Sequence, residues 1–166
     1  SPQPVGCGRS SRRARARRIP RSRCEVEVEP PDWLPRLEAE LRRVGSFQLQ
    51  GHRDLLREDI QIKRDASGET SSVTRWDVES EAMIRDWLAR ELPQHSFLGE
   101  ESGNDRRDPA HYWLCDPIDG TSNFTKGIPF WGSSLGYWRD GVPQGGAIYF
   151  PALDQMFTAW RGGGAW

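Results

Sequence analysis

The chain has 166 residues, 28% charged and 36% hydrophobic, a size and composition that support one folded domain with a real core. No apolar run approaches the roughly 18 residues that a membrane span needs, so we expect no membrane association. The net charge of −1 hides eight arginines between residues 9 and 23, which leave 15 basic against 24 acidic residues elsewhere. An acidic body favours cations over nucleic-acid backbones as partners.

Residues 1–31 are predicted to be a disordered, Arg-rich extension, because they contain almost no large apolar residue. The same composition also fits an organelle-targeting or nucleic-acid-binding arm, or sequence upstream of the true start, since the chain does not begin with Met. There is no apolar segment typical of a secretory signal. The cysteines are odd in number and match no zinc spacing, which indicates a reducing compartment and a cytoplasmic location; they are Cys7, Cys24 and Cys115.

The main domain is predicted to span residues 32–166 and to begin with an amphipathic helix that stops before Gly45. Its apolar residues recur at helical spacing: Trp33, Leu34, Leu37, Leu41 and Val44. The segment from Leu55 to Lys63 fits either helix or extended chain, and residues 65–72 have the composition of a loop.

A second helix is predicted between Thr74 and Pro93. Thr74 is its N-cap, Asp77 occupies the third helical position of a capping box, and Pro93 ends it. Its apolar face comprises Trp76, Met83, Ile84, Trp87, Leu88 and Leu92.

Short strands are predicted to follow, with a hairpin turn at Arg139-Asp140-Gly141. They are Ser96–Leu98, Tyr112–Cys115, Ser133–Trp138, Gly146–Phe150 and Gln155–Trp160. Helices followed by several close-set strands predict an α+β fold with helices layered on a largely antiparallel sheet.

Acidic residues follow two of these strands. Glu100 and Glu101 come after the first strand, Asp116 ends the second, and Asp119 follows one turn later. Carboxylates gathered at strand ends, without His or Cys, suit hard cations such as Mg²⁺.

The segment between and after the two aspartates supplies further groups. Pro117 fixes its own φ, so we expect a sharp turn that aims both aspartates at one point, with the Ile118 carbonyl as a further ligand. Gly120 permits close approach of a ligand, and Thr121 begins a predicted helical turn with free N–H groups for a phosphate. Metal carboxylates beside such a turn predict phosphoryl transfer, in which ions bridge phosphate oxygens and activate a water.

Each feature also has a plain structural interpretation. An Asp-Pro-x-Asp-Gly string is an ordinary turn. Glu100-Glu101 is typical of a solvated pair, and Asp77 is typical of an acid that stabilises a helix N-terminus. Taken singly, these residues leave both interpretations open.

Taken together, three strings resemble the inositol monophosphatase family in order and spacing. They are Val73-Thr74-x-x-Asp77, Phe97-x-Gly99-Glu100-Glu101-Ser102 and Trp113-x-x-Asp116-Pro117-Ile118-Asp119-Gly120-Thr121-x-Asn123-Phe124. A following Pro129-Phe130…Ser133-x-Leu135-Gly136 strand also matches. The resemblance covers residues 33–166 and implies the N-terminal half of the layered αβαβα sugar-phosphatase fold.

The resemblance implies a Mg²⁺-dependent, lithium-sensitive phosphatase that uses two or three ions. Glu100, Asp116 and the Ile118 carbonyl would hold the first ion. Asp116 and Asp119 would share a second.

The resemblance also implies roles in handling water and phosphate. Asp77 and Thr121 would orient or deprotonate the attacking water. The Gly120 and Thr121 amides, together with Asp119, would hold the phosphate, and Glu101 would lie behind the metal ligands.

Members of this family continue into a second α/β half, where a Trp-Asp motif completes the metal site. This chain ends at Trp166, before that half, so we expect a truncated N-terminal half. The predicted function is hydrolysis of inositol monophosphate or a related small phosphate ester, and Ser122-Asn123-Phe124 favours the inositol type. Histidinol phosphate, fructose 1,6-bisphosphate and 3′-phosphoadenosine phosphate are alternative substrates. A non-catalytic metal-binding fragment and a homodimer also stay open.

Overall fold

The computed structural model describes residues 29–55, 60–64, 70–105, 107–108 and 110–166. Residues 1–28 of the predicted extension lie outside the described residues, so the disorder of that segment stays a prediction. Within the described part of the chain, no helix is long and apolar enough to cross a membrane.

Helices separate runs of two or three strands along the described chain. The helices are α1 (Trp33–Asp54), α2 (Arg75–Glu91) and α3 (Thr121–Thr125), with a 3-10 turn η2 (Pro151–Leu153). The strands are β1 (Ile60–Arg64), β2 (Thr70–Thr74), β3 (Ser96–Gly99), β4 (Gly103–Asn104), β5 (His111–Asp119), β6 (Gly132–Arg139), β7 (Val142–Phe150), β8 (Gln155–Trp160) and β9 (Gly164–Ala165).

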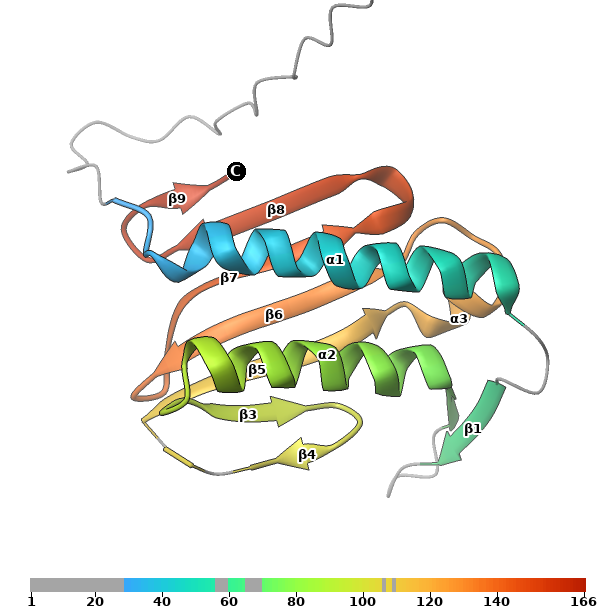
Figure 1. Cartoon of the computed structure of the whole chain (residues 1–166), viewed down its shortest axis with the longest axis horizontal. Helices are drawn as coiled ribbons and strands as arrows, with labels where there is room; N and C mark the ends of the chain where they lie inside the picture. The colour runs from blue at the N-terminus through green and yellow to red at the C-terminus, as the bar shows by residue number, and fades with distance from the viewer. Residues whose placement is uncertain (1–28, 56–59, 65–69, 106, 109) are drawn as a thin grey trace, which may run out of the picture.

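Seven of the strands form one sheet in the order β4-β3-β5-β6-β7-β8-β9. Only the β3–β5 pair is parallel among the described ladders of this sheet, and the others are antiparallel. The helices α1 and α2 lie side by side across one face of the sheet (Figure 1), while β1 and β2 form a separate hairpin. The predicted α+β fold on a largely antiparallel sheet is therefore confirmed.

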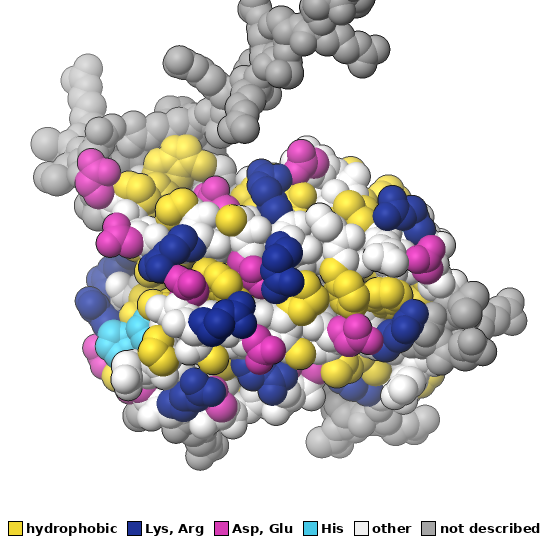
Figure 2. Space-filling view, in the orientation of Figure 1, with side chains coloured by type: hydrophobic (Ala, Val, Ile, Leu, Met, Phe, Trp, Pro, Cys, Tyr) yellow, Lys and Arg dark blue, Asp and Glu magenta, His cyan; other side chains and the backbone are white. Residues whose placement is uncertain are grey.

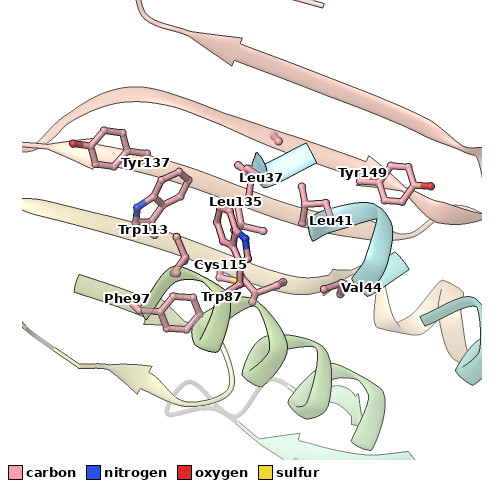
Figure 3. Close-up of a cluster of buried hydrophobic side chains, with 13 residues drawn as sticks. Leu37, Leu41, Val44, Trp87, Phe97, Trp113, Cys115, Leu135, Tyr137 and Tyr149 are labelled. Atoms are coloured by element: carbon pink, nitrogen blue, oxygen red, sulfur yellow. The ribbon is translucent and has the colours of Figure 1, made fainter. Parts of the chain in front are cut away.

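The core lies between the two helices and the sheet (Figure 3). Leu37 and Leu41 of α1 and Trp87 of α2 meet Trp113 of β5 and Leu135 of β6 there. Trp113 is fully buried, and burial of such large apolar side chains is the main source of stability in a domain of this size.

The first helix is ten residues longer than predicted, because α1 continues through Gly45 to Asp54. A Cβ at Gly45 would lie 2.5 Å from Tyr149 Cε1, and one at Gly51 would lie 2.3 Å from the Trp76 ring. These glycines allow α1 to pack closely against two aromatic side chains. Tertiary packing therefore outweighs the low helix propensity of glycine.

The second helix is confirmed, since α2 starts after Thr74, has the predicted capping box and ends before Pro93. The loop predicted for residues 65–72 is wrong in part, because residues 70–72 belong to β2 and pair with β1. The extended alternative for Leu55–Lys63 holds from Ile60 onward, where β1 begins. Residues 56–59 and 65–69 lie outside the described residues.

All five predicted strands are present, and the two short strands β4 and β9 were not predicted. Asp140 and Gly141 have φ values of 51° and 74°, which suits the predicted hairpin turn between β6 and β7. Cys115 is buried and lies in the middle of β5, since that strand continues to Asp119.

Candidate functional site

The end of the sheet near α3 and the N-terminus of α2 collects most of the predicted site residues (Figure 1). Asp77 is 2% exposed and accepts hydrogen bonds at Oδ2 from the Thr74 backbone N–H and hydroxyl, at 2.8 and 2.5 Å. Burial raises the pKa of Asp77 despite these bonds. The capping box therefore holds a carboxyl of increased basicity.

Thr121 connects Asp77 to the neighbouring β5 strand. Its hydroxyl oxygen lies 3.0 Å from Asp77 Oδ1 and 3.0 Å from the Ile118 carbonyl oxygen, so its single proton is shared between two acceptors. Gly120, with φ of 93°, turns the chain from β5 into α3, and a Cβ there would lie 3.2 Å from the Phe130 carbonyl. Glycine is required by both the left-handed backbone and the close approach.

Glu100 follows the end of β3, next to Asp116 within the parallel strand β5. Gly99 pairs with Cys115, and the Glu100 N–H donates to the Cys115 carbonyl at 3.1 Å. Both carboxylates line a cavity of about 400 Å³ together with Ser134 of β6.

A β-bulge, residues 116–119 of β5, brings Asp119 to the same face of the sheet as Asp116. Asp116 pairs with Ser134 and Asp119 pairs with Gly132, so three steps on β5 oppose two on β6. In a regular strand, residues three apart point to opposite faces. The sharp turn predicted at Pro117 is therefore wrong, because the strand continues through it. The bulge places both aspartates on one face, and their convergence on a single ion stays a prediction.

Asp116 carries the clearest electrostatic signal of the site. Burial, the Glu100 carboxylate and the Asp119 carboxylate raise the pKa of Asp116 to about 8. Among the residues that the structure describes, its buried Oδ1 atom has no hydrogen-bond partner. Repelling carboxylates around an unpaired oxygen are the donor chemistry that a hard divalent cation satisfies.

The carboxylate oxygens are suitable ligands for a divalent cation, but the side chains are not arranged as a complete coordination shell. In the described part of the chain, no three His, Cys, Asp or Glu side chains already surround one point. A larger cavity of about 500 Å³ lies on the same sheet face between β6, β7 and β8, but its lining, from Ser134 to Trp166, includes no charged side chain. The carboxylate-lined cavity is therefore the better candidate for chemistry.

Glu101 does not line that cavity. It forms an ion pair with Lys63 of β1, and its backbone N–H donates to Glu81. The role predicted for Glu101 behind the metal ligands stays a prediction.

Glu81 is a site residue that the sequence analysis missed. Its fully buried carboxylate accepts the N–H groups of Glu101 and Ser102 at 2.7 and 2.9 Å and so holds the turn that carries Glu100. A Cβ at Gly99 would lie 2.3 Å from the Glu81 carboxyl carbon, which explains that glycine. The available signal was an acid one helical turn after Asp77, on the side of α2 that faces the sheet.

Comparison with known proteins identifies the family. Residues 38–166 match the inositol monophosphatase family. An inositol-1-monophosphatase of Rhizobium meliloti (strain 1021) is 41% identical over 99 residues, which cover 59% of this chain and 37% of that protein. A histidinol-phosphatase of Mycobacterium tuberculosis (strain ATCC 25618 / H37Rv) is 38% identical over 106 residues, 64% of this chain and 41% of that protein.

Solved structures agree with this comparison. The extragenic suppressor protein suhB of Bartonella henselae superposes with a TM-score of 0.72 at 29% identity, covering 82% of this chain and 52% of that chain. The Thermotoga maritima IMPase gives a TM-score of 0.71 at 29% identity, with 82% and 51% covered.

The fold is therefore the α+β sugar-phosphatase fold. The chain belongs to the inositol monophosphatase family and spans about half of these solved relatives, and less of the curated ones.

Proposed function

We propose that this chain carries the metal-binding and water-activating part of a Mg²⁺-dependent phosphomonoesterase. The observation that carries the proposal is Asp116, whose buried Oδ1 has no hydrogen-bond partner among the described residues and whose carboxyl is subject to the charges of Glu100 and Asp119. Family membership supports phosphatase chemistry, since relatives include proteins named inositol-1-monophosphatase and histidinol-phosphatase. The activity of the whole protein is part of this proposal, because the chain covers only a portion of those relatives.

In this proposal, Glu100, Asp116 and the Ile118 carbonyl hold the first of two or three Mg²⁺ ions, and Asp116 and Asp119 hold the second. Bound Mg²⁺ supplies charge neutralisation for the phosphate oxygens and a lower pKa for water at the site. The carboxylates of this chain fix the number and direction of the ligands.

In this proposal, Asp77 and Thr121 orient the attacking water and accept its proton. When Thr121 directs its hydroxyl proton to Asp77 Oδ1 rather than to the Ile118 carbonyl, its oxygen lone pairs are left to accept a hydrogen bond from the attacking water. Burial raises the pKa of Asp77 towards neutral pH, which makes its carboxylate a stronger base and suits a general base. Asp119 and the Gly120 and Thr121 amides position the phosphate at the start of α3.

Inositol monophosphate is the proposed substrate, or a small phosphate ester related to it. Ser122-Asn123-Phe124 after Gly-Thr supports the inositol type. Histidinol phosphate is the second candidate, because the Mycobacterium tuberculosis relative that is 38% identical is named a histidinol-phosphatase. We further propose that the protein is cytoplasmic, forms a homodimer and has no nucleic-acid partner. Basic and acidic side chains are interspersed on the helix-covered face (Figure 2), which does not favour a nucleic-acid backbone.

The test is phosphate release by this chain extended with the C-terminal region that its relatives possess. We expect Mg²⁺-dependent hydrolysis of inositol 1-phosphate, with histidinol phosphate assayed in parallel. Asp116→Asn removes the central charge and is expected to lower the rate at least a hundredfold. Asp140→Asn, the same change in the remote hairpin turn, is the control. A fully active Asp116→Asn variant would contradict the assigned roles.

A further inference from the structure

The carbonyl of Pro117 is the backbone group that the bulge leaves in need of a partner. Pro117 is buried and lies between the two β5 residues that pair with β6, Asp116 and Asp119. The burial pattern of β5 alternates up to Pro117, and then Ile118 is buried as well, which marks the change of face. A buried carbonyl outside the ladder is costly unless another donor reaches it.

Two buried side chains from different elements supply these donors. Gln48 of α1 donates from Nε2 to the Pro117 carbonyl at 2.8 Å and to Ser133 Oγ at 3.0 Å. Ser133 of β6 donates its hydroxyl to the same carbonyl at 2.8 Å. Both side chains are fully buried, at 0% exposure.

The position of Gln48 on α1 is unusual for a polar residue. It follows Val44 by one helical turn on the buried side of the helix, where Leu37 and Leu41 are also fully buried. A Gln is unfavourable at such a position unless its amide is hydrogen-bonded, whereas an apolar residue would contribute burial at no polar cost. The polar residue is therefore explained by the carbonyl that it contacts rather than by packing.

We propose that Gln48 and Ser133 are positioning residues that clamp the Pro117 carbonyl and thereby hold the bulge. Without the bulge, Asp116 and Asp119 would project from opposite faces of β5 and could not serve one site. The assignment of metal binding to these aspartates rests on the proposed function, but the clamp on the bulge does not. Gln48 and Ser133 touch neither cation nor substrate in this proposal and act through the backbone of residues 116–119.

The first test measures hydrogen exchange of the bulge in the 166-residue chain without metal. Gln48→Met removes the donor at nearly constant shape. Ser133→Val and Ser133→Thr add the same bulk, but only Thr keeps the hydroxyl. We expect amides of residues 118–121 to exchange about tenfold faster in Gln48→Met and Ser133→Val, the factor for one lost buried hydrogen bond, and to stay near wild type in Ser133→Thr.

Two controls separate positioning from general destabilisation. Gln144→Met makes the same chemical change where the side chain donates to the nearby, exposed Val142 carbonyl. Leu41→Val weakens the core on α1 without touching the bulge. Both are expected to leave exchange at residues 118–121 unchanged relative to exchange in the rest of β5. If Gln48→Met does not fold, the comparison of Ser133→Val with Ser133→Thr still tests whether the hydroxyl holds the bulge.

The second test is calorimetric titration with Mn²⁺ alone. Gln48→Met and Ser133→Val are expected to bind Mn²⁺ roughly tenfold more weakly, as for loss of groups that orient metal ligands, with rescue in Ser133→Thr. Wild-type exchange rates in both folded Gln48→Met and Ser133→Val would overturn the clamp. Absent Mn²⁺ binding by the wild type would instead contradict the proposed function, and the exchange measurement would still decide the clamp.

Discussion

The Asp116 carboxyl is protonated far more readily in the folded chain than in the unfolded one, since its pKa rises from 3.8 to about 8. Between these values the folded state binds more protons, so the free energy of unfolding of the metal-free chain falls as the pH rises from about 4 to about 8. A bound divalent cation would offset the carboxylate repulsion that adds to the effect of burial on the pKa of Asp116.

Thermal unfolding at pH 5 and pH 8 tests this pH dependence. We expect the metal-free wild type to melt several degrees lower at pH 8, given roughly 2–4 °C per kcal/mol in a chain of about this size. Asp116→Asn should reduce the difference between the two pH values, and Mg²⁺ should raise the wild-type Tm at pH 8. An identical pH dependence in wild type and Asp116→Asn would contradict the assignment to this carboxyl.

The Thr121 hydroxyl links the capping box of α2 to the start of α3 through Asp77 Oδ1. Thr121→Val keeps the shape and removes the proton link, so we expect phosphate release by the extended chain to fall about 10²- to 10⁴-fold, the range for a lost acid–base group. Thr121→Ser keeps the hydroxyl and should retain most of kcat. Equal losses in both variants would indicate a packing effect instead.

Gly99 has no space for a side chain because the Glu81 carboxyl fills it. Gly99→Ala is expected to lower the free energy of unfolding by about 1–3 kcal/mol and to displace the turn that carries Glu100. Gly136→Ala, where the nearest atom to the added Cβ is 3.5 Å away, is the control in chemical denaturation. Equal stability of both variants would argue against a rigid Glu81 contact.

At the scale of elements, the glycines of α1 do not end the helix but allow it to pack closely against aromatic side chains. Gly51→Ala should improve helix propensity by about 1 kcal/mol, yet we expect it to destabilise the chain, because the added Cβ meets the Trp76 ring at 2.3 Å. Ser46→Ala on the exposed side of α1 should be neutral or stabilising. Denaturant unfolding of both variants measures the sign, and a stabilised Gly51→Ala variant would contradict the close packing.

Elements with local signals were predictable, and those that depend on distant contacts were not. The start of α2 follows from Thr74 and Asp77 alone, and the β6–β7 turn follows from Asp140-Gly141. The extension of α1 past Gly45 depends on Tyr149, which is distant in sequence. The strand at residues 70–72 depends on pairing with β1, which its loop-like composition conceals.

At the scale of the whole molecule, the sheet topology assembles the candidate site. The parallel β3–β5 pair brings Glu100 beside Asp116, and α3 brings Thr121 to the N-terminus of α2. The motifs predicted this gathering of acids. They did not include Glu81, whose one signal is its place a helical turn after Asp77 on α2, or Gln48, whose role depends on a carbonyl distant in sequence.

Glu100, Asp116 and Asp119 are proposed to form a binding site for divalent cations. Calorimetric titration of the chain with Mg²⁺ at about pH 7.5 tests this site most directly. Asp116→Asn is the site variant, and Asp140→Asn is the matched control. We expect saturable binding by the wild type and by Asp140→Asn, and its loss in Asp116→Asn. Binding that is unchanged in a folded Asp116→Asn variant would contradict the account.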